Sequence, residues 1–218
     1  MLVYMIILLR IFFLPLADLA DDGKGRGANP NEKSEWIHVK CHRGVNLYER
    51  LVIANALEVR ERKGELVVTC DFDTVANFLS APENMKLWMK GVKKVNCLKT
   101  ESSNKWTVYT IYGLPWPFEN KEMISDYEFK QTGPEKCVVQ LKSIDTLKEG
   151  KSRMERITNF RGNWLITKID EQTTKIEFSV VCATPPMVPR WIQDPIIKRI
   201  FLKNMIRMKK QLSKGSKH

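Results

Sequence analysis

The stretch IYGLPWPFENKEM, residues 111–123, places two prolines and two large aromatic residues between segments that both have strand character. Proline has no backbone N–H to donate to a β-ladder, so a Pro-Trp-Pro run favours the edge or the corner of a sheet. We therefore predict a bend at residues 115–117, with Trp116 and Phe118 covering apolar space beneath it.

The length and composition are those of one globular domain with a short extension. The chain has 218 residues, of which 43% are hydrophobic, and this is enough for a sizeable core. Its formal net charge is +11 and its sequence pI is about 9.4, so the surface should favour anionic partners.

The first 20 residues, MLVYMIILLRIFFLPLADLA, are almost entirely apolar. The run is short for a transmembrane helix and contains Arg10 and Pro15, so we predict a signal peptide. A retained anchor and an artefact of an upstream translation start are the alternatives, because no Lys or Arg precedes the run. Residues 21–34 are predicted to be a flexible, glycine-rich linker. We expect an exported protein, periplasmic or secreted, if the segment is cleaved, and a membrane-anchored or cytoplasmic one otherwise.

A period of two predicts that most of the domain, residues 35–213, is β-structure. Strands are expected within 44–52 and 56–70, and then at 92–99, 104–113, 122–131, 136–145, 153–160, 163–170 and 174–184. So many successive strands favour an antiparallel, meandering sheet over a βαβ fold. Two short helices are predicted before residue 91, one capped by Asp71 or Asp73 and one opened by Pro82.

The C-terminal segment changes to a helical period. We predict a helix from about 195 to 213, with Asp194 as its N-cap and Pro195 at its first position. Nine Lys and Arg residues from Arg190 onward stand against one acid, and residues 214–218 form a basic tail. The basic face is expected either to be solvated or to dock onto an anionic membrane surface.

These elements predict an α+β, helix-grip architecture, in which a curved antiparallel sheet holds the long C-terminal helix. A helix laid across a curved sheet commonly leaves a cavity between the two.

The chain contains three notable segments, GVNLYER (44–50), YTIYGLPWPFENKEMI (109–124) and MVPRWIQD (187–194). These segments, together with the predicted order of strands and helices, resemble the START domains. START domains are the lipid-transfer relatives of the steroidogenic acute regulatory protein within the helix-grip (SRPBCC) superfamily. The resemblance covers about 35–213. Lys121 stands where the family motif usually has arginine, so it keeps the charge but loses the bidentate fork. The resemblance implies binding, and transport, of a lipid or other hydrophobic small molecule in an internal cavity.

Aromatic residues and methionines are the candidate cavity lining, because deformable apolar side chains suit such a pocket. Arg161, beside Trp164, is the candidate charged group inside it. Ordinary packing is the alternative for each apolar residue, and solvent exposure is the alternative for Arg161. The candidate ligand-binding residues are Trp88, Met89, Tyr109, Tyr112, Trp116, Phe118, Arg161, Trp164, Trp191, Met205 and Met208.

The sequence contains no nucleophile elbow, P-loop or dinucleotide-binding loop. His38, Cys41 and His42 have an H-x-x-C-H spacing, but no fourth ligand accompanies them, so we predict no metal site and no cofactor. The five cysteines form no CxxC pair and are predicted to be buried free thiols. One surface disulfide remains an alternative for an exported protein.

Two other function classes stay open at this point. A helix-grip enzyme, cyclase-like or hydrolase-like, would need an acid/base pair inside the cavity and would act on a hydrophobic substrate. An interaction protein would use the basic helix on a macromolecule and would have a filled core. Nucleic acid is disfavoured because the basic face lacks interleaved aromatic residues, and we expect a monomer.

Overall fold

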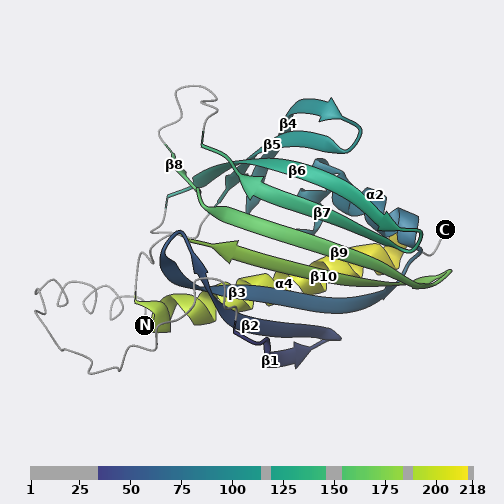
Figure 1. Ribbon diagram of the computed structural model, residues 1–218, viewed down its shortest axis with the longest axis horizontal. Coiled ribbons are helices and arrows are strands. Elements are labelled where there is room, and N and C mark those ends of the chain that lie inside the picture. The colour runs from purple at the N-terminus through teal and green to yellow at the C-terminus, as the bar shows by residue number, and fades with distance from the viewer. Residues whose placement is uncertain (1–33, 114–118, 146–153, 184–188, 216–218) are drawn as a thin grey trace, which may run out of the picture. The chain divides into compact units, whose positions relative to one another are not determined.

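The structure is a computed structural model that describes residues 34–113, 119–145, 154–183 and 189–215. The predicted signal segment, the linker up to Lys33, the Pro-Trp-Pro corner with Trp116 and Phe118, and residues 216–218 of the basic tail lie outside the described residues. Figure 1 shows a large sheet with a long helix, α4, running along one of its faces.

The described elements follow the predicted order, except that the first strand, at residues 37–42, was not predicted. The strands are β1 (Ile37–His42), β2 (Val45–Ala54), β3 (Leu57–Thr69), β4 (Val92–Ser102), β5 (Lys105–Tyr112), β6 (Lys121–Gly133), β7 (Lys136–Ser143), β8 (Glu155–Arg156), β9 (Phe160–Asp170) and β10 (Thr173–Cys182). The helical segments are α2 (Phe72–Ser80), the 3₁₀ helix η1 (Pro82–Asn84), α3 (Met85–Trp88) and α4 (Arg190–Gly215). The strand predicted at 153–160 is only the two residues of β8.

The strands form one sheet in the order β1-β2-β3-β10-β9-β7-β6-β5-β4. Every neighbouring pair along this order is antiparallel, and β8 adds a short parallel pairing with β6. The predicted antiparallel sheet is therefore confirmed. Because β10 joins β3, the first hairpin and the last strand become neighbours, and this brings α4 against β2 and β3.

Local sequence explains the short helices between β3 and β4. The Asp71 side chain accepts a hydrogen bond from the Thr74 backbone N–H at 2.8 Å, which confirms one of the two predicted caps. These N–H contacts also hold the pKa of the exposed Asp71 carboxyl below its usual value. Pro82 is the first residue of η1, as predicted, and α3 follows directly.

The start of α4 differs from the prediction. The helix begins at Arg190, so Pro195 lies inside it, and Asp194 is not its cap. The Pro189 carbonyl instead accepts hydrogen bonds from the backbone N–H groups of Ile192 and Gln193, at 2.9 and 3.1 Å. The Asp194 carboxylate is engaged elsewhere, because it pairs with Arg60 and Arg62 of β3 at 2.9 Å each.

The core lies between α4 and the face of the sheet that it covers, which we call the inner face; the opposite side is the outer face. Met205 and Met208 of α4 are fully buried in this core with Leu66 and Ile176 of the inner face. Gly64 permits the close approach of α4, since a Cβ there would lie 2.9 Å from the Met205 methyl carbon. This packing confirms the helix-grip fold.

No disulfide joins the five cysteines within the described part of the chain. Cys70 and Cys137 are buried, as predicted, whereas Cys41, Cys97 and Cys182 are exposed, so that prediction is wrong for three of the five. No helix in the described part of the chain is both long and apolar enough to cross a membrane. Within the same residues, no group of three His, Cys, Asp or Glu side chains is placed to hold a metal ion.

Candidate functional site

A small cavity lies between the inner face and the helical segment 79–89. Its volume is about 40 Å³, which is room for roughly one or two water molecules. The segment contributes Leu79, Ser80, Ala81, Pro82, Met85, Trp88 and Met89, and the sheet contributes Trp106, Tyr112, Met123, Tyr127, Leu141, Phe160, Trp164 and Phe178. Fourteen of the fifteen side chains are apolar or aromatic, so the cavity favours an apolar occupant.

Aromatic rings connect the cavity to α4. The Trp164 and Phe178 rings stack with centroids 3.7 Å apart, and Trp88 meets Trp164 edge-on at 5.5 Å. On the other side Phe178 stacks with Phe201 of α4 at 5.9 Å. Offset and edge-on ring pairs are favourable beyond their buried area. The cavity wall and the gripped helix are thus joined by one continuous aromatic contact.

Two polar atoms of the cavity lining are buried without a hydrogen-bond partner among the described residues. These are the Ser80 hydroxyl oxygen and the Trp106 indole nitrogen. Leaving a buried polar group unpaired costs about 1–3 kcal/mol in proteins, so such groups need an explanation. The indole N–H can donate, and a hydroxyl can donate and accept, so a polar ligand atom that reaches either one could form the missing hydrogen bond.

The titratable side chains of the described lining are the two phenols of Tyr112 and Tyr127. Burial raises the pKa of both hydroxyls well above the usual tyrosine value. Both tyrosines are therefore protonated near neutral pH. The cavity presents hydrogen-bonding phenols, and its described lining has no carboxylate, imidazole or amine.

Four of the predicted ligand-binding residues come together at this cavity: Trp88, Met89, Tyr112 and Trp164. Whether they contact a ligand stays a prediction. Three others lie elsewhere. Met205 and Met208 are buried in the core between α4 and the sheet, and Trp191 is 77% exposed at the first turn of α4.

Tyr109 is placed on the wrong face by the prediction. It lies three residues from Tyr112 on the same strand, and side chains three apart in a strand point to opposite faces. The Tyr109 hydroxyl donates to Glu122 Oε2 at 2.9 Å, and the guanidinium of Arg156 donates to the other carboxylate oxygen at 2.7 Å. Tyr109 therefore completes a buried ion pair on the outer face.

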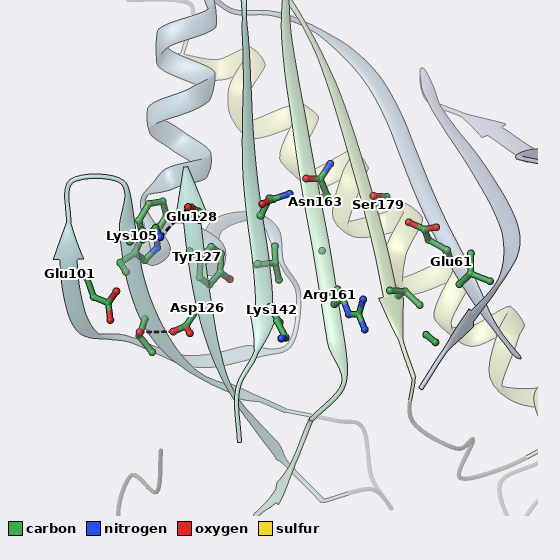
Figure 2. A pocket seen from close by; sticks show the side chains of 18 of the residues that line it. Glu61, Glu101, Lys105, Asp126, Tyr127, Glu128, Lys142, Arg161, Asn163 and Ser179 are labelled. Atoms are coloured by element: carbon green, nitrogen blue, oxygen red, sulfur yellow. Dashed lines mark hydrogen bonds and ion pairs between the residues drawn. The ribbon is translucent and has the colours of Figure 1, made fainter. Parts of the chain in front are cut away.

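Arg161 is misplaced for the same reason, because it is three residues from Trp164 on β9. It is exposed on the outer face, where it lines a hollow of about 650 Å³. Figure 2 shows that Arg161, Lys142 and Asn163 project from neighbouring strands of this face, with α4 behind the sheet. This hollow is larger than the apolar cavity and lies on the opposite side of the sheet, and 11 of its 19 lining residues are polar or charged.

The prediction missed Ser80, Trp106 and Phe178 as lining residues. The two-residue period of a strand could have identified Phe178 and Trp106, because residues an even number of positions apart share a face. Phe178 shares a face with Ile176, and Trp106 shares one with Val108 and Tyr112. Ser80 ends α2, and no sequence pattern marks it as a cavity residue.

Comparison with solved structures settles the fold. A STAR-related lipid transfer protein from Xanthomonas axonopodis matches with a TM-score of 0.71 and 19% identity, over 81% of this chain and 98% of that chain. The chain has a START-type helix-grip fold. Human StAR-related lipid transfer protein 5 matches this START-like chain with a TM-score of 0.69 and 11% identity, over 84% of this chain and 88% of that one.

More distant relatives of the START-like fold include an enzyme. The Zhui aromatase/cyclase from Streptomyces matches with a TM-score of 0.54 and 14% identity, over 71% of this chain and 93% of that chain. Comparison of the sequence with protein-family models and with curated proteins finds no match. At these identities the likeness establishes the fold, and one fold serves several functions.

Proposed function

We propose that the protein binds a hydrophobic small molecule, such as a lipid, in the cavity between the inner face and residues 79–89. The observation that carries this proposal is an apolar, aromatic cavity with two unpaired polar atoms, Ser80 Oγ and Trp106 Nε1. Apolar walls with a few polar groups are typical of sites for hydrophobic ligands. The lipid-transfer proteins of the same fold support this class of ligand.

A lipid needs far more room than 40 Å³, so binding requires the cavity to open. The wall at residues 79–89 is suited to move, because η1 and α3 have only three and four residues and such short helices have little stability of their own. Three side-chain hydrogen bonds tie the wall to α4: Asn204 accepts from the Lys90 N–H at 3.1 Å, and Arg207 and Gln211 donate to the Leu87 carbonyl at 3.3 Å. Opening would break these few contacts and expose the aromatic lining.

We propose binding rather than catalysis for this cavity. General acid–base catalysis needs groups whose pKa lies near the working pH. The described lining supplies two phenols whose pKa is raised by burial, and these suit a hydrogen bond to a ligand better than proton transfer.

The test is native mass spectrometry of the full chain, purified without detergent, followed by organic extraction. We expect a hydrophobic species bound at one per chain. Ala81→Trp should reduce its occupancy at least tenfold, because the indole would fill the cavity beside Ser80. Asn77→Trp is the control, since this residue is exposed on the neighbouring helix α2. A chain that carries no ligand and takes up none from a lipid and sterol panel would refute the proposal.

The proposal extends to docking on a membrane through the exposed side of α4. Ile192, Ile196 and Ile200 are exposed at steps of four residues, and Lys203, Arg207 and Lys210 continue the same side toward the C-terminus. We call these six residues the α4 ridge. Helices that lie on a membrane surface typically insert apolar side chains between the lipids, and their neighbouring Lys and Arg side chains contact the anionic headgroups.

Ile196→Glu is expected to weaken binding to phosphatidylserine-containing vesicles by roughly tenfold or more, since burying one isoleucine is worth about 1.5–3 kcal/mol. The matched control is Ile169→Glu on β9, because Ile169 is 54% exposed and Ile196 is 51% exposed. Vesicle co-sedimentation measures both. Equal losses for the two variants would exclude the α4 ridge as the docking surface.

A further inference from the structure

The outer face carries ionisable side chains in rows that run across the strands. One row is Thr107, Asp126, Lys142, Arg161 and Val181, on β5, β6, β7, β9 and β10, and each is the cross-strand partner of the next. These five residues all line the 650 Å³ hollow. A volume of this size is within the range of small-molecule sites, about 300–1,000 Å³.

Most other charges of the outer face are paired across strands. Lys105 pairs with Glu128 at 3.2 Å, Arg50 pairs with Glu61 at 2.6 Å, and Lys175 pairs with Glu65 at 3.3 Å. These ion pairs neutralise two of the four acids that line the hollow, Glu61 and Glu128, and Lys99 pairs with a third, Glu101, at 2.9 Å. The hollow is therefore not as acidic as its composition indicates.

Lys142 and Arg161 are exceptions to this pairing. They are directly opposite each other, and neither has a carboxylate within 4.0 Å among the described residues. Like charges opposite each other across two strands destabilise a sheet, so this pair costs free energy in the unliganded protein. A doubly charged anion between them would remove that cost and would gain charge-assisted hydrogen bonds from the planar guanidinium and the ammonium group.

A second observation concerns Asn163, which follows Arg161 by two residues on the same face of β9. Its Oδ1 is buried without a hydrogen-bond partner among the described residues, and the side chain lines the hollow (Figure 2). Residues two apart in a strand are separated by roughly 7 Å. An oxygen that only accepts needs an N–H or O–H donor, and a ligand spanning this distance could supply one.

We infer that the hollow of the outer face is a binding site for a phosphate ester that carries a free hydroxyl group. Lys142 and Arg161 hold the phosphate, and Asn163 Oδ1 accepts the hydroxyl. Asp126, the other cross-strand neighbour of Lys142, accepts a hydrogen bond from the Thr107 hydroxyl at 2.7 Å and has no cation within 4.0 Å in the described chain. Its charge limits the affinity for anions. The site is independent of the inner cavity, because it lies on the other side of the sheet.

The experiment titrates the full chain with glycerol 3-phosphate and with inorganic phosphate, followed by NMR or calorimetry. We expect the ester to bind more tightly than phosphate, and the double variant K142Q/R161Q to bind it at least tenfold more weakly than the wild type. Asp126→Asn should bind more tightly, and Asn163→Leu should abolish the preference for the ester. The matched control K40Q/K136Q removes two exposed strand lysines and should bind as the wild type does.

Vesicles that contain phosphatidic acid distinguish a lipid headgroup from a free ester. If K142Q/R161Q loses vesicle binding as well as glycerol 3-phosphate, the hollow accepts a headgroup; if it loses only glycerol 3-phosphate, the ligand is soluble. The inference is overturned if the wild type binds neither probe at millimolar concentration, or if K142Q/R161Q and K40Q/K136Q behave alike. Occupancy of the inner cavity in native mass spectra is unaffected by either result.

Discussion

Glu49→Gln is expected to lower the free energy of unfolding by about 3 kcal/mol, because it breaks a buried ion-pair network. Glu49 pairs with Arg62 at 2.8 Å and with Lys198 of α4 at 3.0 Å, and its side chain is only 6% exposed. Arg62, 9% exposed, also pairs with Asp194 of α4. We call Glu49, Arg60, Arg62, Asp194 and Lys198 the α4 clamp. Removing the Glu49 charge leaves three cations of the clamp with one acid.

Urea denaturation of the wild type and the variant measures this loss. Glu171→Gln is the matched control, since Glu171 pairs with Lys168 but is 89% exposed, and it should change stability little. The double variant E49M/R62M should recover much of the loss, because no buried charge is then left unpaired. The difference should also persist at 1 M salt, which screens surface pairs. A loss of less than about 1 kcal/mol for Glu49→Gln would mean that the clamp is solvated.

The sequence around Glu49 indicates a buried charge on β2. Glu49 alternates with Val45 and Leu47, two residues that form the buried face of β2. A charged side chain on the buried face of a strand needs an oppositely charged partner, because burying it unpaired would destabilise the folded strand. The pattern predicts that a partner exists, but it does not predict which one. The partner of Asp194 was equally hidden in the sequence, because its pairing with β3 arises only from the fold. Asp194 was therefore predicted to be a helix cap.

The order of elements was predictable because it rests on local patterns. Alternation located the long strands, Asp71 and Pro82 located the short helices, and the three segments of START resemblance indicated how they assemble. Which side chains of each strand point inward was less predictable. Pairing Tyr109 with Tyr112, and Arg161 with Trp164, joined residues at odd spacing, although a period of two forbids a common face. Which parity faces inward depends on where α4 packs, and that is a long-range property of the chain.

The cavity itself was predictable in kind but not in size. Apolar inward positions and a gripped helix imply space between sheet and helices, and the candidate residues Trp88 and Trp164 both line the cavity that the structure shows. The volume depends on how the rings pack, since one indole displaced by a few ångströms would change it severalfold. Side-chain packing at this level is set jointly by several strands, so no single segment of sequence determines it.

Trp164→Ala is expected to lower the free energy of unfolding by about 3–5 kcal/mol, the usual cost of deleting a large buried aromatic ring. Trp164 is 3% exposed and contacts both Phe178 and Trp88. Leu165→Ala is the control on the next residue: Leu165 points to the outer face and is only partly buried, so it should cost about 1 kcal/mol. If Trp164→Ala is too unstable to purify, Trp164→Phe keeps a stacked ring and should show a smaller loss in the same direction.

The same variant tests the inner cavity directly. Deleting the indole joins new apolar space to the existing 40 Å³, and an apolar cavity of this kind binds small aromatic molecules. Added indole should therefore raise the melting temperature of Trp164→Ala, by a stabilisation that grows as RT ln(1 + [L]/Kd), and should leave Leu165→Ala unchanged. If indole does not restore Trp164→Ala, the wall at residues 79–89 has collapsed into the space. A wall that collapses into empty space must be displaced when a ligand enters. If indole fails to stabilise Trp164→Ala, displacing this wall is therefore the main free-energy cost of ligand binding.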